Sequence, residues 1–176
     1  MKVVILDGTY GTTGNQARDQ VMAAYKDHDL DYIKLEDKKI AYCTGCWSCW
    51  VKTPGACCHG DDTQEVLRAS INADFVVILT ENAAGYMTSL SKKMLEKFVP
   101  LVHPYIELVD GECHHIARYD KYPKLGLVYL DEDLDHTDFH ITRHMVKRAA
   151  LNFKTSLDYA VHSAPGKELA IEDIRI

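Results

Sequence analysis

The chain opens on the stretch Val3-Val4-Ile5-Leu6-Asp7-Gly8-Thr9-Tyr10-Gly11-Thr12-Thr13-Gly14-Asn15. Residues 3–6 form a continuous apolar run, which is typical of a strand buried on both faces of a parallel sheet. A loop rich in glycine and hydroxyl side chains follows this run. A helix is expected next, because four apolar residues fall on one helical face: Ala17, Val21, Ala24 and Tyr25. The stretch therefore predicts a strand, a loop and a helix in that order.

The same strand-then-helix pattern repeats along the chain. Further strands are expected at residues 32–35, 75–79, 125–130 and 157–161, and helices at 62–72, from 88 to Pro100, and around 139–153. Strands that alternate with helices predict a parallel sheet covered on both faces. Five strands suit a flavodoxin-like three-layer α/β sandwich with strand order 2-1-3-4-5. Residues 103–123, rich in His, Tyr and Pro, are expected to be irregular.

Length and charge limit the classes of function. A chain of 176 residues predicts a single domain over residues 1–176. The net charge of −6 argues against binding to nucleic acid or to an anionic membrane surface. No stretch approaches the roughly 18 apolar residues of a membrane span, and the chain enters a strand at once without a secretory signal. We therefore expect a cytoplasmic protein with reduced thiols.

Two loops at the carboxyl ends of the first and third strands predict the binding site, because ligands of such sheets bind at the switch point between these strands. The first loop joins glycines and hydroxyl donors to a helix N-terminus, which suits a phosphate. It lacks a Gly-Lys-Ser/Thr ending and does not match Gly-x-Gly-x-x-Gly, so a monophosphate such as that of FMN fits better than a pyrophosphate. The second loop would lie against the flavin ring. The predicted cofactor-binding residues are Thr9, Gly11, Thr12, Thr13, Gly14, Asn15, Thr80, Glu81, Asn82, Ala83, Ala84, Gly85 and Tyr86. The alternative is that the first loop only connects a strand to a helix.

Four cysteines are closely spaced in the segment after the second strand. Cys43, Cys46, Cys49 and Cys57 have the spacing Cys-x2-Cys-x2-Cys-x7-Cys, and Cys58 follows directly. Such a run indicates metal, cluster or redox chemistry. Three alternatives stay open: free or partly disulfide-bonded cysteines, an iron–sulfur cluster, and a structural zinc ion. The sixth cysteine, Cys113, is isolated and is expected to be a small buried apolar residue.

Several segments resemble a known family. Thr12-Thr13-Gly14-Asn15 is similar to the phosphate loop of flavodoxins. Residues 73–104 resemble the second flavin loop and the following helix of NAD(P)H-dependent FMN reductases of the flavodoxin superfamily. The cysteine run with Asp61-Asp62, and the segment His114-His115-x-x-Arg118-Tyr119-x-x-Tyr122-Pro123, resemble a branch of that family that includes iron–sulfur flavoproteins. The chain departs from the pattern in two places. Its first loop has no arginine, and Glu81 stands where the second loop usually has proline.

The resemblance implies an FMN-dependent oxidoreductase that passes electrons from NAD(P)H to a quinone, a flavin or another small-molecule or protein acceptor. No catalytic side chain is demanded, since the chemistry is carried out on FMN. One alternative is an iron–sulfur flavoprotein that carries electrons, with a 4Fe–4S cluster on Cys43, Cys46, Cys49 and Cys57. The other is a non-catalytic thiol sensor. A homodimer or higher homo-oligomer is also predicted, in which residues 42–60 and 103–123 of a neighbour cover the flavin. The histidines at 114 and 115 would line the site or a subunit contact.

Overall fold

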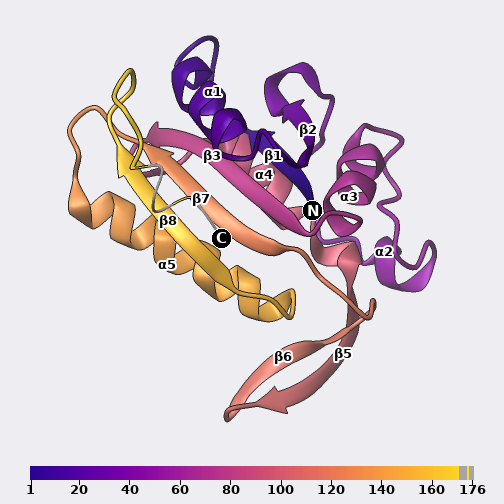
Figure 1. Ribbon diagram of the computed structural model, residues 1–176. Coiled ribbons are helices and arrows are strands. Elements are labelled where there is room, and N and C mark those ends of the chain that lie inside the picture. Colours follow the sequence, from indigo (N-terminus) through magenta and orange to yellow (C-terminus); the bar gives the residue numbers. More distant parts are fainter. Residues whose placement is uncertain (171–173, 175–176) are drawn as a thin grey trace.

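A computed structural model describes residues 1–170 and 174, and five parallel strands form its centre (Figure 1). Their order is β2-β1-β3-β7-β8, which corresponds to 2-1-3-4-5 when the parallel strands are numbered along the chain. The predicted flavodoxin-like topology is therefore confirmed. The strands are β1 (Lys2–Asp7), β2 (Asp29–Lys34), β3 (Phe75–Ala83), β7 (Lys124–Leu130) and β8 (Leu157–Ser163).

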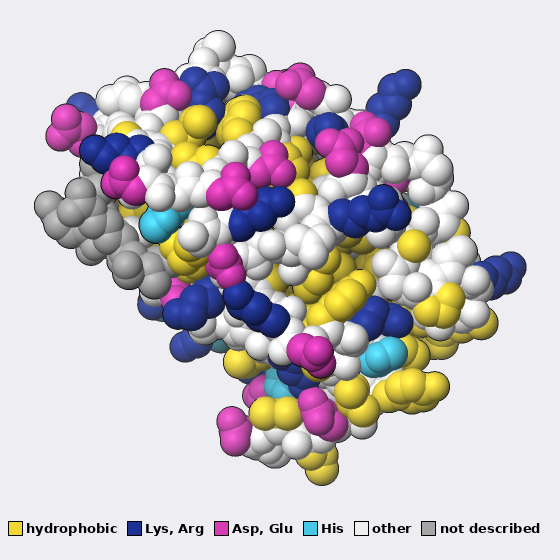
Figure 2. Space-filling model, turned by 45° about the vertical axis from the view of Figure 1, so that its right-hand side comes forward, with side chains coloured by type: hydrophobic (Ala, Val, Ile, Leu, Met, Phe, Trp, Pro, Cys, Tyr) yellow, Lys and Arg dark blue, Asp and Glu magenta, His cyan; other side chains and the backbone are white. Residues whose placement is uncertain are grey.

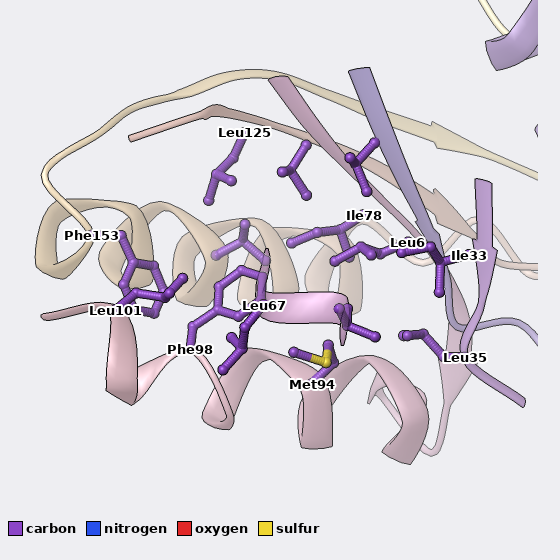
Figure 3. Close-up of a cluster of buried hydrophobic side chains, with 14 of the residues drawn as sticks. Leu6, Ile33, Leu35, Leu67, Ile78, Met94, Phe98, Leu101, Leu125 and Phe153 are labelled. Carbon is purple, nitrogen blue, oxygen red and sulfur yellow. The ribbon is translucent and has the colours of Figure 1, made fainter. Parts of the chain in front are cut away.

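Helices cover both faces of this sheet. On one face, α3 (Thr63–Ile71), α4 (Ser89–Glu96) and α5 (His136–Asn152) contribute to the larger hydrophobic cluster. On the other face, α1 (Asn15–Ala24) packs together with Leu169 and Ile174 from the C-terminal segment. Figure 3 shows the larger cluster, where Leu6, Ile78 and Leu125 of the sheet face Met94 and Phe98. Short helical segments are η1 (Leu35–Asp37), α2 (Ser48–Val51) and η2 (Val99–Leu101).

A close contact between two neighbouring strands requires glycine at position 126. A Cβ atom on Gly126 of β7 would lie 2.4 Å from the ring of Tyr159 on β8. That ring in turn stacks on Phe75, with centroids 5.6 Å apart and planes inclined by 10°. The absent side chain therefore makes room for an aromatic stack across three strands.

Residues 103–123 were expected to be irregular, and this prediction was wrong. β5 (Val102–Val109) and β6 (Glu112–Ala117) form an antiparallel hairpin that projects from the body (Figure 1). Asp110 and Gly111 make its turn with φ angles of 52° and 82°, which is the backbone of a two-residue hairpin turn. The hairpin carries exposed apolar side chains at Tyr105, Ile106 and Leu108, and Figure 2 shows yellow side chains on this lower projection. In the described part of the chain, no helix has the length and apolar character needed to cross a membrane.

Candidate functional site

A hollow of about 470 Å³ lies at the edge where β1, β3 and β7 end. This edge is the predicted switch point, since α1 leaves β1 toward one face of the sheet and α4 follows β3 on the other. Five of the predicted cofactor residues line the hollow: Thr13, Glu81, Asn82, Ala84 and Gly85. Its volume lies in the range of ordinary ligand sites, roughly 300–1,000 Å³.

Thr9 shapes the first loop from inside rather than facing the hollow. It is fully buried, and both its N–H and its hydroxyl donate to Oδ1 of Asp7, at 2.9 and 2.7 Å. Asp7 is also buried and accepts from the Tyr32 hydroxyl at 2.7 Å. A Cβ atom at Gly14 would come within 2.3 Å of the Thr9 hydroxyl, so the loop closes tightly only with glycine there.

The outer part of the first loop offers donors to an anion. Thr12 is exposed and Thr13 half-buried, and Gly14 starts α1 without a side-chain cap on the first-turn N–H groups. Two N–H groups of this loop already donate to carboxylates: Tyr10 to Glu81 at 2.8 Å and Gly11 to Glu36 at 3.0 Å. The loop therefore binds anionic oxygens, which is the property a phosphate requires.

The second loop is a tight turn, because β3 pairs back on β4 (Tyr86–Met87). The Asn82 side chain holds this turn: its amide donates to Asp138 at 3.0 Å, and its oxygen accepts from the N–H of Gly85 at 2.8 Å. Thr80 is buried, and its hydroxyl is hydrogen-bonded to the N–H and the hydroxyl of Thr88. Thr80 therefore stabilises the turn from inside the protein and does not face the hollow.

Tyr86 was expected to border the flavin ring, but its side chain packs against the larger hydrophobic cluster. Burial, and secondarily the charge of Glu96, raises the pKa of its hydroxyl. Four acidic residues of the hollow were not predicted from the sequence: Asp131, Glu132, Asp133 and Asp138. Three of them directly follow the apolar run of the fourth predicted strand, and that position was a usable signal.

The cysteine segment forms a second cavity, of about 170 Å³. Five of the six cysteines line it: Cys43, Cys46, Cys49, Cys57 and Cys58. Trp50, Val99 and Pro100 supply apolar walls, and the Trp50 indole N–H donates to the carbonyls of Val99 and Val102 at 3.3 and 3.0 Å. The four predicted cluster ligands thus converge on one partly enclosed space.

A buried lysine faces these sulfur atoms. The side chain of Lys97 is only 2% exposed, and its Nζ lies 3.3 Å from Sγ of Cys57. A buried ammonium group is costly unless an anion or strong acceptor pairs with it. Lys97 therefore places a positive charge beside the sulfur of Cys57, which favours negative charge in this cavity.

The thiols differ in their electrostatic surroundings. Hydrogen bonds from the Ser48 side chain and backbone, and then from Cys58, lower the pKa of Cys46 to about 6. Burial, with the charges of neighbouring cysteines, raises the pKa of the Cys49 thiol. The Sγ atoms of Cys46 and Cys58 lie 3.7 Å apart, and all six cysteines are free. Cys113 is exposed on β6, so the prediction that it is buried was wrong.

Residues 114–118, which include His114, His115 and Arg118, connect the hairpin to the rest of the protein. His114 is buried between Glu112 and Asn152 of α5, at 3.1 and 3.3 Å. The ring of His115 lies 5.1 Å from the ring of Trp50, next to the cysteine cavity. Arg118 donates to the carbonyl of Val102 at 3.3 Å. This segment therefore ties the hairpin to α5 through His114 and places it next to the cysteine segment through His115.

Both implied cofactors fit the residues present. For FMN, the fit rests on the anion-binding loop and on the size of the hollow beside it. For a 4Fe–4S cluster, it rests on the four converging thiols and the buried cation. Among residues 1–170 and 174, no group of three or more His, Cys, Asp or Glu side chains is close enough to hold one ion. The four ligands of a 4Fe–4S cluster each bind a separate iron, so they do not have to meet at one ion.

The chain matches no protein-family model. It is 29% identical over 108 residues to an iron–sulfur flavoprotein of Archaeoglobus fulgidus, covering 58% of this chain and 48% of the relative. It is also 29% identical over 105 residues to an iron–sulfur flavoprotein of Methanocaldococcus jannaschii, covering 57% and 53%. The chain thus spans about half the length of the curated relatives it matches.

Solved structures share the fold over nearly the whole chain. RosB with bound 8-demethyl-8-formylriboflavin-5′-phosphate has a TM-score of 0.66 at 18% identity, covering 96% of this chain and 67% of RosB. An azoreductase of Bacillus anthracis has a TM-score of 0.64 at 10% identity, covering 92% and 86%. The chain therefore has the flavodoxin-like fold of NAD(P)H:FMN reductases and is a distant homologue of archaeal iron–sulfur flavoproteins.

Proposed function

We propose that this protein is an electron-transfer flavoprotein that binds FMN at the carboxyl edge of the sheet and a 4Fe–4S cluster in the cysteine cavity. The convergence of Cys43, Cys46, Cys49 and Cys57 on one cavity beside buried Lys97 carries the proposal. When bound, FMN supplies one- and two-electron chemistry and the cluster supplies one-electron chemistry.

At the flavin site, the chain would bind and orient. The hydroxyl groups of Thr12 and Thr13, the first-turn N–H groups of α1 and the loop N–H groups of Tyr10 and Gly11 would hold the phosphate. Two hydrogen bonds of the Asn82 side chain hold the turn, which would offer backbone groups to the ring. The carboxylates of the hollow would disfavour negative charge on the ring.

At the cysteine site, the chain would supply ligands and control charge. Lys97 would offset the negative charge of four thiolate ligands, and Trp50 and Pro100 would limit access of water. Both the nearby positive charge and the exclusion of water change the reduction potential of an iron–sulfur cluster.

A second copy of the chain is part of the proposal. Ser89 at the start of α4 follows the flavin loop, whereas Glu96 and Lys97 at its other end line the cysteine cavity. Eight helical residues span about 12 Å, so the two sites lie at opposite ends of this helix. We propose a homodimer or higher homo-oligomer in which residues 42–60 and 103–123 of a neighbour cover the flavin. The exposed apolar side chains of the hairpin support this arrangement. Sedimentation that shows only monomer for the cofactor-loaded protein contradicts it.

A second candidate is an NAD(P)H-dependent FMN oxidoreductase with a quinone, a free flavin or another small acceptor, working in the cytoplasm. Its support is the fold shared with the azoreductase, together with a flavin hollow that is open to small molecules. Steady oxidation of NADH or NADPH with such an acceptor, in protein that lacks iron, favours this candidate over the first.

The decisive experiment is anaerobic purification followed by a visible absorption spectrum and assays for iron, sulfide and flavin. We expect bound flavin and about four irons per chain. Cys49→Ser should lose the iron, whereas the matched control Cys113→Ser should keep it, because Cys113 lies on exposed β6. Colourless protein without iron that fails to take up FMN at micromolar concentration overturns the proposal.

A further inference from the structure

The first loop is held between two carboxylates that come from neighbouring strands. The N–H of Tyr10 donates to Oε1 of Glu81 at 2.8 Å, and the N–H of Gly11 donates to Oε2 of Glu36 at 3.0 Å. Glu81 lies near the end of β3 and Glu36 lies in η1, directly after β2. The loop between them is therefore already bound to two anionic groups of the protein itself.

These bonds use donors that a phosphate would need. Backbone N–H groups in the loop after the first strand are the usual phosphate ligands of such folds. A phosphate that approaches this loop also meets like charge. Glu81 lines the flavin hollow, and so do Asp131, Glu132 and Asp133. No Lys or Arg side chain is among the described residues that line this hollow.

Burial does not explain why the two carboxylates accept hydrogen bonds from the loop. Glu36 is exposed and Glu81 is only half-buried, so both could remain hydrated without the loop. Their common feature is that each accepts from a loop N–H, across 25 and 71 residues of sequence. Hydrogen bonds to an ionised acceptor are about twice as strong as neutral ones, so the carboxylates are effective competitors for these donors.

We propose that Glu36 and Glu81 are specificity-determining residues that occupy the loop as internal anions. A bound FMN has to displace both carboxylates, so its phosphate contributes little to binding, and the site binds riboflavin almost as tightly as FMN. This inference rests on the proposed flavin site and adds a statement about which flavin that site selects.

The test measures binding of FMN and of riboflavin by fluorescence quenching, in wild type, Glu36→Gln, Glu81→Gln and the double variant. Glutamine keeps the size and an acceptor oxygen but removes the charge. We expect each single substitution to raise FMN affinity about tenfold and the double about a hundredfold, since a charged competitor becomes a neutral one. Riboflavin affinity should change less than about threefold, because it lacks the phosphate.

Asp37→Asn is the matched control. It removes a charge next to Glu36 in η1, but Asp37 does not line the hollow, and no N–H of the first loop donates to it. It should change FMN affinity less than about threefold. Equal gains for FMN and riboflavin, or no gain for either, overturn the inference while the flavin site stands. An FMN gain in Asp37→Asn as large as in Glu36→Gln also overturns it, because the gain would then come from the net charge of the protein and not from the hydrogen bond to the loop. If no variant binds either flavin, the proposed flavin site fails and the inference fails with it.

Discussion

Replacing Cys57 by alanine should leave the ammonium group of Lys97 buried without its hydrogen-bond partner. The lysine side chain is 2% exposed, and its Nζ lies 3.3 Å from the sulfur. Leaving a buried donor without its acceptor costs roughly 1–3 kcal/mol, and more for a charged group. We expect about 2 kcal/mol, because Cys57 is half-buried and the charge of Asp61 also interacts with Lys97. Against a typical total stability of roughly 5–15 kcal/mol, this is easily measured.

A double-mutant cycle with Lys97→Met tests the physical reason. The double variant Cys57→Ala, Lys97→Met should recover most of the loss, with a coupling free energy of about 2 kcal/mol. The measurement is urea denaturation of metal-free protein with reductant and chelator present. Cys113→Ala, at an exposed position, should cost less than about 0.5 kcal/mol. If the changes in the free energy of unfolding caused by the two single substitutions add within about 0.5 kcal/mol, Lys97 is not paired with this sulfur.

Three further predictions follow from single contacts. Ser48→Ala should raise the pKa of Cys46 from about 6 toward its ordinary value, and so slow alkylation of that thiol by iodoacetamide at pH 7 several-fold, as followed by peptide mass spectrometry. Gly126→Ala places a methyl group 2.4 Å from a tyrosine ring and should cost roughly 1–3 kcal/mol in urea denaturation, whereas Gly60→Ala, with open space around it, should be nearly neutral. Hydrogen bonds from two N–H groups at the start of α5 lower the pKa of Asp135, so its stabilising effect is present above the unfolded pKa of about 3.9 and is lost as the pH falls through the lower folded value. Asp135→Asn should therefore make the melting temperature less dependent on pH between about 5 and 2, and an unchanged dependence contradicts this assignment.

Much of the fold could be predicted because its signals are local. The strands Val3–Leu6 and Phe75–Leu79 are apolar at every position, as burial on both faces requires. The helices that follow them show the 3.6-residue period. Once these elements alternate, the rule of right-handed crossovers leaves few topologies. The loop after the first strand was placed at the site for the same reason.

The hairpin was missed because it lacks such a signal. Most of β5 and β6 is exposed, so no buried face imposes an alternating pattern on the sequence. The turn residues Asp110 and Gly111 were the usable clue. For a related reason, the direction of the Tyr86 side chain could not be predicted: its position in the loop is local, but its packing depends on the core beneath.

The sequence by itself determined the order of strands and helices, the edge where a ligand would bind, and the group of closely spaced thiols. These properties follow from side-chain chemistry and spacing over a few residues. Only the tertiary structure decided which charges meet. It brought Lys97 to Cys57 across 40 residues, and the carboxylates of Glu36 and Glu81 to the amides of the first loop. The physical reason is that charge pairing depends on distance in space, and neighbouring strands of this sheet are separated by long stretches of chain.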